Sequence, residues 1–130
     1  MRPIEFRAYL KYKKKIVDVI MLEPENKVRY DDDDVIEECD IDECELMQFT
    51  GLYDKNGKEI CEGDIVKVSY DRTSMEWNAI VRFGIIKEAY KLIGYYLEPI
   101  SESPYNQSII ALRDLEVIGN IYENKELIGE

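Results

Sequence analysis

Apolar and polar residues alternate along the start of the chain, as they do in half-buried β-strands. In residues 4–10 the apolar side chains of Ile4, Phe6, Ala8 and Leu10 fall on every second position, and IVDVIML at 16–22 reads as a second strand. The charged residues 11–15 between these segments are typical of a solvated turn. The pattern predicts an N-terminal β-hairpin over residues 1–22.

A second group of apolar runs follows after residue 45. It is rich in β-branched and aromatic residues, which pack well on pleated surfaces. Turn residues separate the runs, so we expect a strand-built core over 46–123 and a polar tail over 124–130. The segment IIALRDL at 109–115 is predicted to form one short helical turn. The expected strands are LMQFTGL (46–52), residues 65–68, WNAIVRFGII (77–86), AYKLIGYYLEPI (89–100) and EVIGNIY (116–122).

Three glycines punctuate the most strongly patterned stretch, residues 50–68. Asn56 and Gly57 form the dipeptide preferred in tight turns with positive φ, and Gly63 with Asp64 marks another bend. Together with Gly51, these residues are interpreted as backbone geometry rather than a phosphate cradle, which needs a different spacing and a following helix.

The segment 23–45 has a different character. Pro24 and Asn26 suggest a turn, and residues 31–34 are four consecutive aspartates. Asp34 followed by Glu37 resembles a helix N-cap with its return partner. The sequence therefore predicts an acidic insert that is either a loop or a short helix.

Composition places the chain among single cytosolic domains. Its 130 residues fit one domain, and 45% hydrophobic content supports a core. No apolar run reaches the roughly 20 residues of a membrane-spanning helix, and the charged N-terminus lacks the apolar stretch of a signal peptide. Three cysteines, an odd number, suit a reducing compartment such as the cytoplasm.

The formal charge of −11 is distributed unevenly. Residues 1–15 carry six basic side chains against Glu5 alone, while residues 23–45 carry twelve acidic ones against two basic, a local net of −10. Such a surface repels phosphate backbones and attracts a basic protein or a cation. The candidate partner-binding residues are Asp31, Asp32, Asp33, Asp34, Glu37 and Glu38.

Other candidate chemistry is weakly supported. Cys39, Cys44 and Cys61 are poorly spaced for zinc in a chain without histidine, and buried cysteines are the simpler interpretation. The missing histidines also remove the commonest general base. Residues 31–34 with Asp40 and Asp42 do not match a calcium loop, because the aspartates are contiguous and no glycine falls among them. Non-specific attraction of divalent cations is compatible with them.

Neither paired carboxylates nor aromatic residues change this view. Glu59, Glu62 and Asp64 flank a turn, where acidic residues usually cap backbone amides. Trp77, Tyr95 and Tyr96 fit strand packing better than a base-stacking platform. We therefore predict no catalytic residue, no metal and no cofactor.

The chain resembles the YopX family of phage and prophage proteins. The resemblance is carried by FRAY (6–9), LMQFTGLYDKNGKEICEGDIVKV (46–68) and VIGNIYENKEL (117–127), in that order. It implies an SH3-like barrel with added strands, encoded by a phage or an integrated element, and it implies no reaction. The fold class expected is mainly β, with an N-terminal β-hairpin and the acidic insert added to the small barrel.

The function that fits these observations is a non-catalytic protein-interaction module acting as a phage or prophage accessory protein. One alternative is an acidic DNA mimic that inhibits a basic host protein, and another is a nucleic-acid-binding barrel. The basic hairpin complements the acidic segment, either within one chain or between neighbouring chains, and exposed strand edges favour self-association. A homo-oligomer is therefore also expected.

Overall fold

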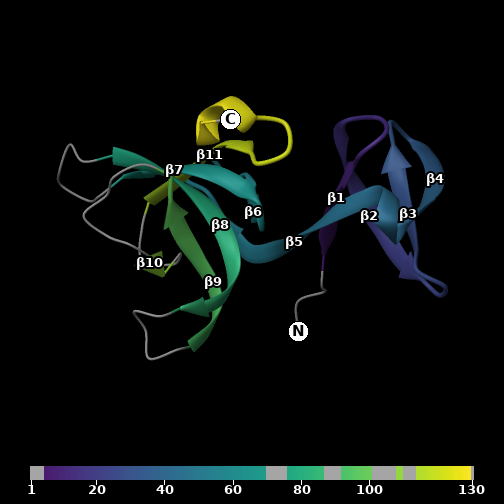
Figure 1. Cartoon of the computed structure of the whole chain (residues 1–130), viewed down its shortest axis with the longest axis horizontal. Coiled ribbons are helices and arrows are strands. Elements are labelled where there is room, and N and C mark those ends of the chain that lie inside the picture. Colours follow the sequence, from purple (N-terminus) through teal and green to yellow (C-terminus); the bar gives the residue numbers. More distant parts are fainter. Residues whose placement is uncertain (1–4, 70–75, 87–91, 101–107, 110–113, 130) are drawn as a thin grey trace. The chain divides into compact units, whose positions relative to one another are not determined.

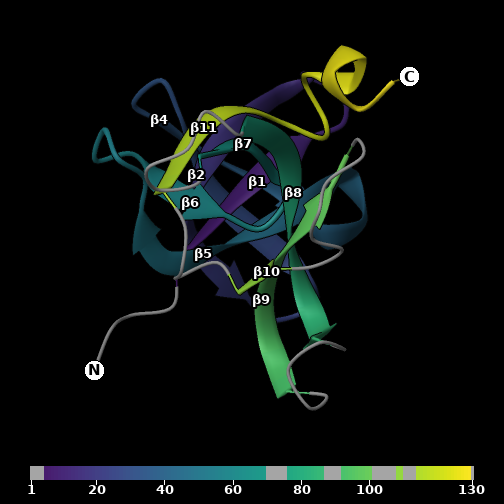
Figure 2. The ribbon, with the colours of Figure 1, turned by 90° about the vertical axis from the view of Figure 1, so that its left-hand side faces the viewer.

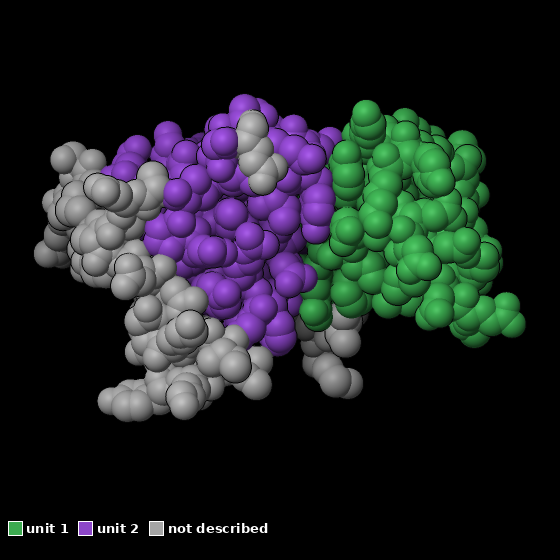
Figure 3. Space-filling view, in the orientation of Figure 1, with its two compact units in different colours: residues 1–49 green, residues 50–130 purple. Residues whose placement is uncertain are grey.

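The computed structural model describes residues 5–69, 76–86, 92–100, 108–109 and 114–129. The predicted mainly β fold is confirmed, because antiparallel strands make up most of this chain. The strands that the structure describes form two open sheets and do not close into a barrel. Contacts between residues divide the chain into two compact units, residues 1–49 and residues 50–130 (Figure 3).

Unit 1 is built around the predicted hairpin. Its strands are β1 (Phe6–Leu10), β2 (Lys15–Glu23), β3 (Lys27–Asp32) and β4 (Val35–Asp40), together with the first half of β5 (Cys44–Tyr53). The sheet order is β4-β3-β2-β1-β5-β6, so β4 is an edge strand (Figure 1). Every second residue faces a small apolar core, made by Ala8, Leu10, Val17, Val28, Tyr30 and Cys44.

The acidic segment 23–45 is not the loop or short helix that the sequence predicted. It forms β3 and β4, followed by a three-residue 3-10 helix, Ile41–Glu43. The sequence predicted a helix N-cap at Asp34 whose backbone would bond to the Glu37 side chain. The structure has this type of contact at the 3-10 helix instead, where the side chain of Glu43 accepts a hydrogen bond from the backbone N–H of Asp40 at 3.0 Å. The segment boundaries predicted at 22/23 and 45/46 fall within β2 and β5.

Unit 2 contains the second sheet, in the order β10-β9-β8-β7-β11. Its core is a cluster of apolar side chains from β6, β7, β8, β9 and β11, including Ile60, Val66, Trp77 and Leu97. The long strands β8 and β9 form an antiparallel pair, in which Ala79 lies opposite Pro99 at one end and Ile86 lies opposite Leu92 at the other (Figure 2). The bounds are β6 (Glu59–Cys61), β7 (Asp64–Ser69), β8 (Glu76–Ile86), β9 (Leu92–Pro99), β10 (Ser108–Ile109) and β11 (Asp114–Asn120).

The predicted helical turn at 109–115 and the predicted polar tail both belong to unit 2. In segment 109–115 only Ile109, Asp114 and Leu115 are described, all in strands, and the rest of the predicted helical turn lies outside the described residues. The tail 124–130, which was predicted to be polar, contains a 3-10 helix, Lys125–Ile128. The helices that the structure describes are three and four residues long, too short to cross a bilayer.

The glycines of residues 50–68 have φ angles of 88° at Gly51, 82° at Gly57 and 89° at Gly63. L-residues with a Cβ rarely adopt this conformation. Gly57 and Gly63 lie in turns, whereas Gly51 lies inside β5, where a positive φ re-directs the strand without ending it.

Candidate interaction surface on the β3–β4 hairpin

The candidate partner-binding residues come together on one hairpin. Asp33 and Asp34 are the two turn residues between β3 and β4, with φ angles of 51° and 69°. Two successive positive φ angles match the tight hairpin turns of type I′. The backbone N–H of Asp34 donates to Asp31 Oδ1 at 2.8 Å, which holds the turn closed. The sequence therefore places a run of carboxylates at the tip of a defined β-hairpin.

Lysines from the β1–β2 bend neutralise part of this charge within the same chain. Lys13 Nζ lies 2.6 Å from Asp32 Oδ2 and 2.5 Å from Glu37 Oε2, and Lys15 also pairs with Asp32. Hydrogen bonds from Lys13 lower the pKa of both Asp32 and Glu37 below their usual values. Of the two arrangements that the sequence left open for the basic hairpin, the intramolecular one is therefore observed.

The other carboxylates at the tip are less compensated. The side chain of Asp33 is 93% exposed and approaches Lys15 only at 3.4 Å. Asp31 lies directly opposite Asp18 of β2, a like-charge cross-strand pair that is unfavourable by itself. A hollow of about 360 Å³ opens here, lined by Lys15, Ile16, Val17, Asp18, Asp31, Asp32, Asp33 and Asp34. Its wall carries more carboxylates than cations, so it favours a positively charged group.

The distal part of β4 carries a second acidic group. Lys27 pairs with Asp40, and Arg29 donates to Glu23 Oε2 at 3.1 Å. Glu38 has no ion pair within the described residues. A hydrogen bond with Glu23, with burial and like charge adding to it, raises the pKa of Glu38. A cation brought to this strand would relieve that crowding of carboxyl groups.

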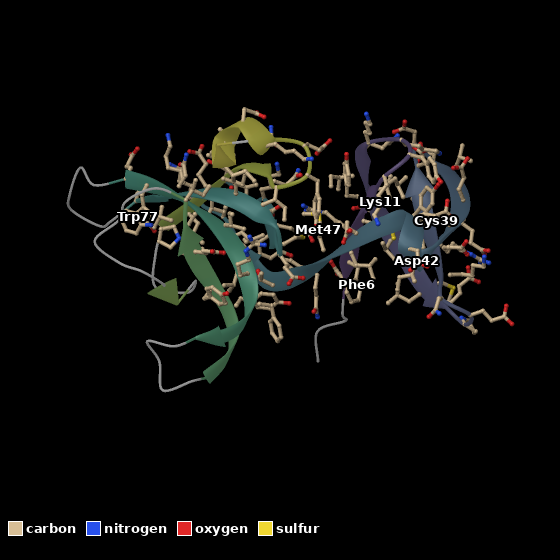
Figure 4. All side chains as sticks on the ribbon, in the orientation of Figure 1. Phe6, Lys11, Cys39, Asp42, Met47 and Trp77 are labelled. Carbon is tan, nitrogen blue, oxygen red and sulfur yellow. The ribbon has the colours of Figure 1, made fainter. Side chains whose placement is uncertain are left out.

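Lys11 joins the β1–β2 bend to the 3-10 helix that follows β4 (Figure 4). Its Nζ donates to the backbone carbonyl of Asp42 at 2.9 Å and lies 3.5 Å from Glu45 Oε1. Asp42 therefore contributes its backbone rather than a metal-ligating carboxylate to this contact.

The cysteines considered for zinc occupy core positions. Cys39 and Cys44 both pack in the core of unit 1, while Cys61 is buried in β6 of unit 2. Burial raises the pKa of Cys44 to about 12, which keeps it as a neutral thiol. Among the described residues, no three cysteine or carboxylate side chains converge as metal ligands do.

The remaining candidates have structural surroundings. Asp64 Oδ2 accepts a hydrogen bond from the N–H of Cys61 at 2.8 Å, which is the capping contact expected at such a turn. Trp77 belongs to the core of unit 2, and Tyr95 packs against that core and meets Phe83 edge-on at 5.0 Å between ring centroids. Tyr96, half-buried, lies opposite Arg82 in the β8–β9 pair. Glu59 and Glu62 flank the same bend as Asp64.

Asp54 is an organising residue that sequence analysis did not identify. It is buried, and its Oδ1 accepts from the N–H groups of Asn56 and Lys58 at 2.8 and 2.9 Å. Its Oδ2 accepts from the N–H of Val117 at 2.9 Å. Burial acts to raise the pKa of Asp54, but these hydrogen bonds outweigh it and hold the pKa below its usual value. The sequence did contain a signal for this role: Asp54 lies two residues before Asn56-Gly57, a position from which an aspartate side chain often bonds to the backbone of the turn.

The motif VIGNIYEN also builds a turn. The buried side chain of Asn120 accepts from the N–H groups of Tyr122 and Glu123 at 3.0 and 2.9 Å. Asn124 Oδ1 in turn accepts from the N–H of Asn120 at 3.0 Å. A Cβ on Gly119 would lie only 2.6 Å from that oxygen, so glycine provides the space for this contact. The resemblance motifs therefore fix strand ends and turns.

A family model described as YopX protein matches residues 5–129. The chain belongs to the YopX protein family. Among solved structures, the crystal structure of protein EF1440 from Enterococcus faecalis is similar, with 25% sequence identity and a TM-score of 0.61. The match covers 98% of this chain and 99% of that chain, so both units take part in it. No curated protein matches this YopX family member.

Proposed function

We propose that the chain is a non-catalytic protein-interaction module that binds a basic partner protein through the β3–β4 hairpin. The observation that carries this proposal is the surplus of carboxylates at the hairpin after its own lysines are paired. Asp33 is almost fully exposed, and Asp31 and Glu38 have no ion pair within the described residues. Surplus charge of one sign steers an oppositely charged partner and selects against wrong ones.

The turn itself supports this function. Asp33 and Asp34 both adopt positive φ, a conformation that glycine or an asparagine–glycine pair would adopt at lower cost. The chain therefore retains two carboxylates at positions where other residues would give a more stable turn. Residues that are suboptimal for stability are expected at functional sites.

We further propose an accessory role for a phage or prophage in the cytoplasm of its host. This rests on the resemblance to phage and prophage proteins together with the absence of a catalytic constellation from the sequence. Occupying the nucleic-acid site of a basic host protein, as DNA would, is the sharper form of the same proposal. Direct nucleic-acid binding has less support, since Lys13 and Lys15 are engaged by carboxylates.

Affinity capture with matched charge variants tests the proposal. The site variant carries Asp33→Asn, Asp34→Asn and Glu38→Gln, and the control carries Glu59→Gln, Glu62→Gln and Asp114→Asn, which remove the same charge from unit 2. We expect basic proteins identified by mass spectrometry to be retained by wild type and control but lost by the site variant. Equal capture by both variants, or a captured set without basic proteins, would contradict the proposal. Competition by DNA for the captured protein then tests mimicry.

A further inference from the structure

The backbone of β4 offers a hydrogen-bonding edge as well as charge. Among the described strands, β4 pairs only with β3, and it ends the six-stranded sheet. Its six residues pair with β3 without a register shift, from Lys27↔Asp40 to Asp32↔Val35. The strand is therefore regular over its whole length, and its second edge is equally regular.

The register shows which backbone groups point outward. In a two-residue hairpin the flanking residues, Asp32 and Val35, exchange both hydrogen bonds, and hydrogen-bonded pairs then alternate along an antiparallel ladder. The N–H of Ile41 donates to the carbonyl of Asn26 at 2.8 Å, which agrees with this alternation of hydrogen-bonded and non-hydrogen-bonded pairs. Consequently the N–H and C=O groups of Ile36, Glu38 and Asp40 point away from β3.

Only one of these outward N–H groups has an acceptor within the described chain. The N–H of Asp40 donates to Glu43 Oε1 at 3.0 Å, which confirms the outward direction. No acceptor for the N–H of Ile36 or Glu38 occurs among the described residues. Ile36 and Glu38 are two positions apart, and each presents one N–H donor and one C=O acceptor, which is the pattern that an added strand would pair with.

β4 lacks most of the devices that usually protect an edge strand. It has no proline, no lysine and no bulge, and it exposes Val35 (56%) and Ile36 (64%) beside its carboxylates. Negative charge is the remaining protection. That charge opposes pairing with a second copy of β4, because like charges opposite one another are destabilising, but it favours a basic strand.

We propose that β4 accepts an extended basic segment of a partner protein as an additional strand, paired to the outward backbone groups of Ile36 and Glu38. This rests on the proposed function and specifies its binding mode. Lysine or arginine side chains opposite Glu37 and Glu38, and apolar ones opposite Val35 and Ile36, complement the strand. A cation opposite Glu38 also offsets the repulsion between Glu38 and Glu23.

A synthetic peptide tests strand addition without altering the protein. The probe is a ten-residue peptide in which pairs of lysines alternate with pairs of valines. Its matched control has the same sequence with N-methyl groups on two adjacent central residues, which preserves charge and side chains but blocks both backbone edges. At physiological salt we expect the control to bind at least tenfold more weakly in calorimetry.

Amide hydrogen exchange gives a second measurement. We expect saturating probe to slow exchange at Ile36 and Glu38 at least tenfold, whereas Glu37 and Cys39, already bonded to β3, change little. Equal affinity of probe and control, no binding of the probe, or unchanged exchange at Ile36 and Glu38 would each overturn strand addition. Failure of the proposed function is distinguishable, because capture would then not depend on the hairpin carboxylates.

Discussion

Several single side chains in this protein stabilise turns by accepting hydrogen bonds from backbone N–H groups, in the place of backbone carbonyl groups. Asp54 serves three backbone N–H groups, and Asn120 serves two. These contacts explain why the family motifs contain short polar residues beside glycine. They also predict that adding one methyl group, or replacing one oxygen atom, at these turns lowers the stability of the protein.

Gly119→Ala should destabilise the protein by about 1–3 kcal/mol, because the new Cβ would overlap Asn124 Oδ1 at 2.6 Å and break its contact with Asn120. Gly84→Ala is the matched control, since its Cβ would meet only Tyr96 at 3.7 Å, an ordinary contact. Urea denaturation measures both. Equal loss of stability in the two variants would contradict the role given to Gly119.

Asp54→Asn should lower the free energy of unfolding by about 1–3 kcal/mol, because an amide NH2 would replace one acceptor oxygen and leave a buried donor without a partner. The exposed residue Asp114, changed to asparagine, is the control. The folded-state pKa of Asp54 is lowered, so its contribution is complete above the unfolded-state pKa and disappears as the pH falls through the folded-state value. The difference between wild type and variant should therefore shrink in acid.

Among the elements, the N-terminal hairpin was predicted well and the acidic segment was not. The alternation of residues 4–10 gave β1 directly, since one face of the strand is buried. In β3 the same signal was present, with Val28 and Tyr30 buried between charged neighbours, but the aspartates that follow are depleted in strands and obscured it. The sequence predicted that the basic hairpin complements this segment, but not the specific pairing of Lys13 and Lys15 with Asp32, because that is a tertiary contact between distant residues.

The type I′ turn gives a prediction at this scale. Asp34→Gly should stabilise the protein by roughly 0.5–1 kcal/mol, because glycine adopts positive φ without the Cβ penalty and one charge leaves the acidic tip. Thermal unfolding measures the change. A lower melting temperature for the variant would show that the carboxylate stabilises the turn more than its backbone conformation costs.

The ion pairs of the same hairpin predict a pH dependence. The folded-state pKa values of Asp32 and Glu37 are lowered, so their pairing stabilises above the usual carboxyl pKa values of 3.8 and 4.5 and is lost as the pH falls through the folded-state values. Lys13→Gln should therefore lower the melting temperature at pH 6 and have a smaller effect near pH 3. An effect that did not change with pH would contradict this assignment.

For the whole molecule, the mainly β fold was predictable because strand patterns recur throughout the chain. The open sheets were not, since closure depends on how distant strands pair. The candidate surface was predictable as a charge but not as a hairpin with a free edge. β1 and β2 proved to be interior strands with partners on both sides, so the hairpin edges no longer support self-association.

Self-association stays a prediction. Among the described strands β11 ends the second sheet, but the N–H of Val117 already donates to Asp54 and the carbonyl of Leu115 accepts from the N–H of Lys55, so only the rest of that edge can pair with another chain. Sedimentation velocity at tens of micromolar and physiological salt should show a species larger than a monomer, as mass action requires for a weak complex. A monomer throughout this concentration range would contradict the prediction. The site variant described above should behave as the wild type does, because its substitutions lie on unit 1.

β5 constrains how the gene can be rearranged. The strand starts at Cys44 in unit 1 and ends at Tyr53 in unit 2, so the boundary between the units falls inside a continuous strand. Its first half pairs with β1, and it is also the neighbour of β6. A recombination event that exchanged the acidic unit at residue 49 would join two unrelated half-strands. Exchange between relatives is therefore expected to keep Cys44–Tyr53 whole, and the two units to be inherited together.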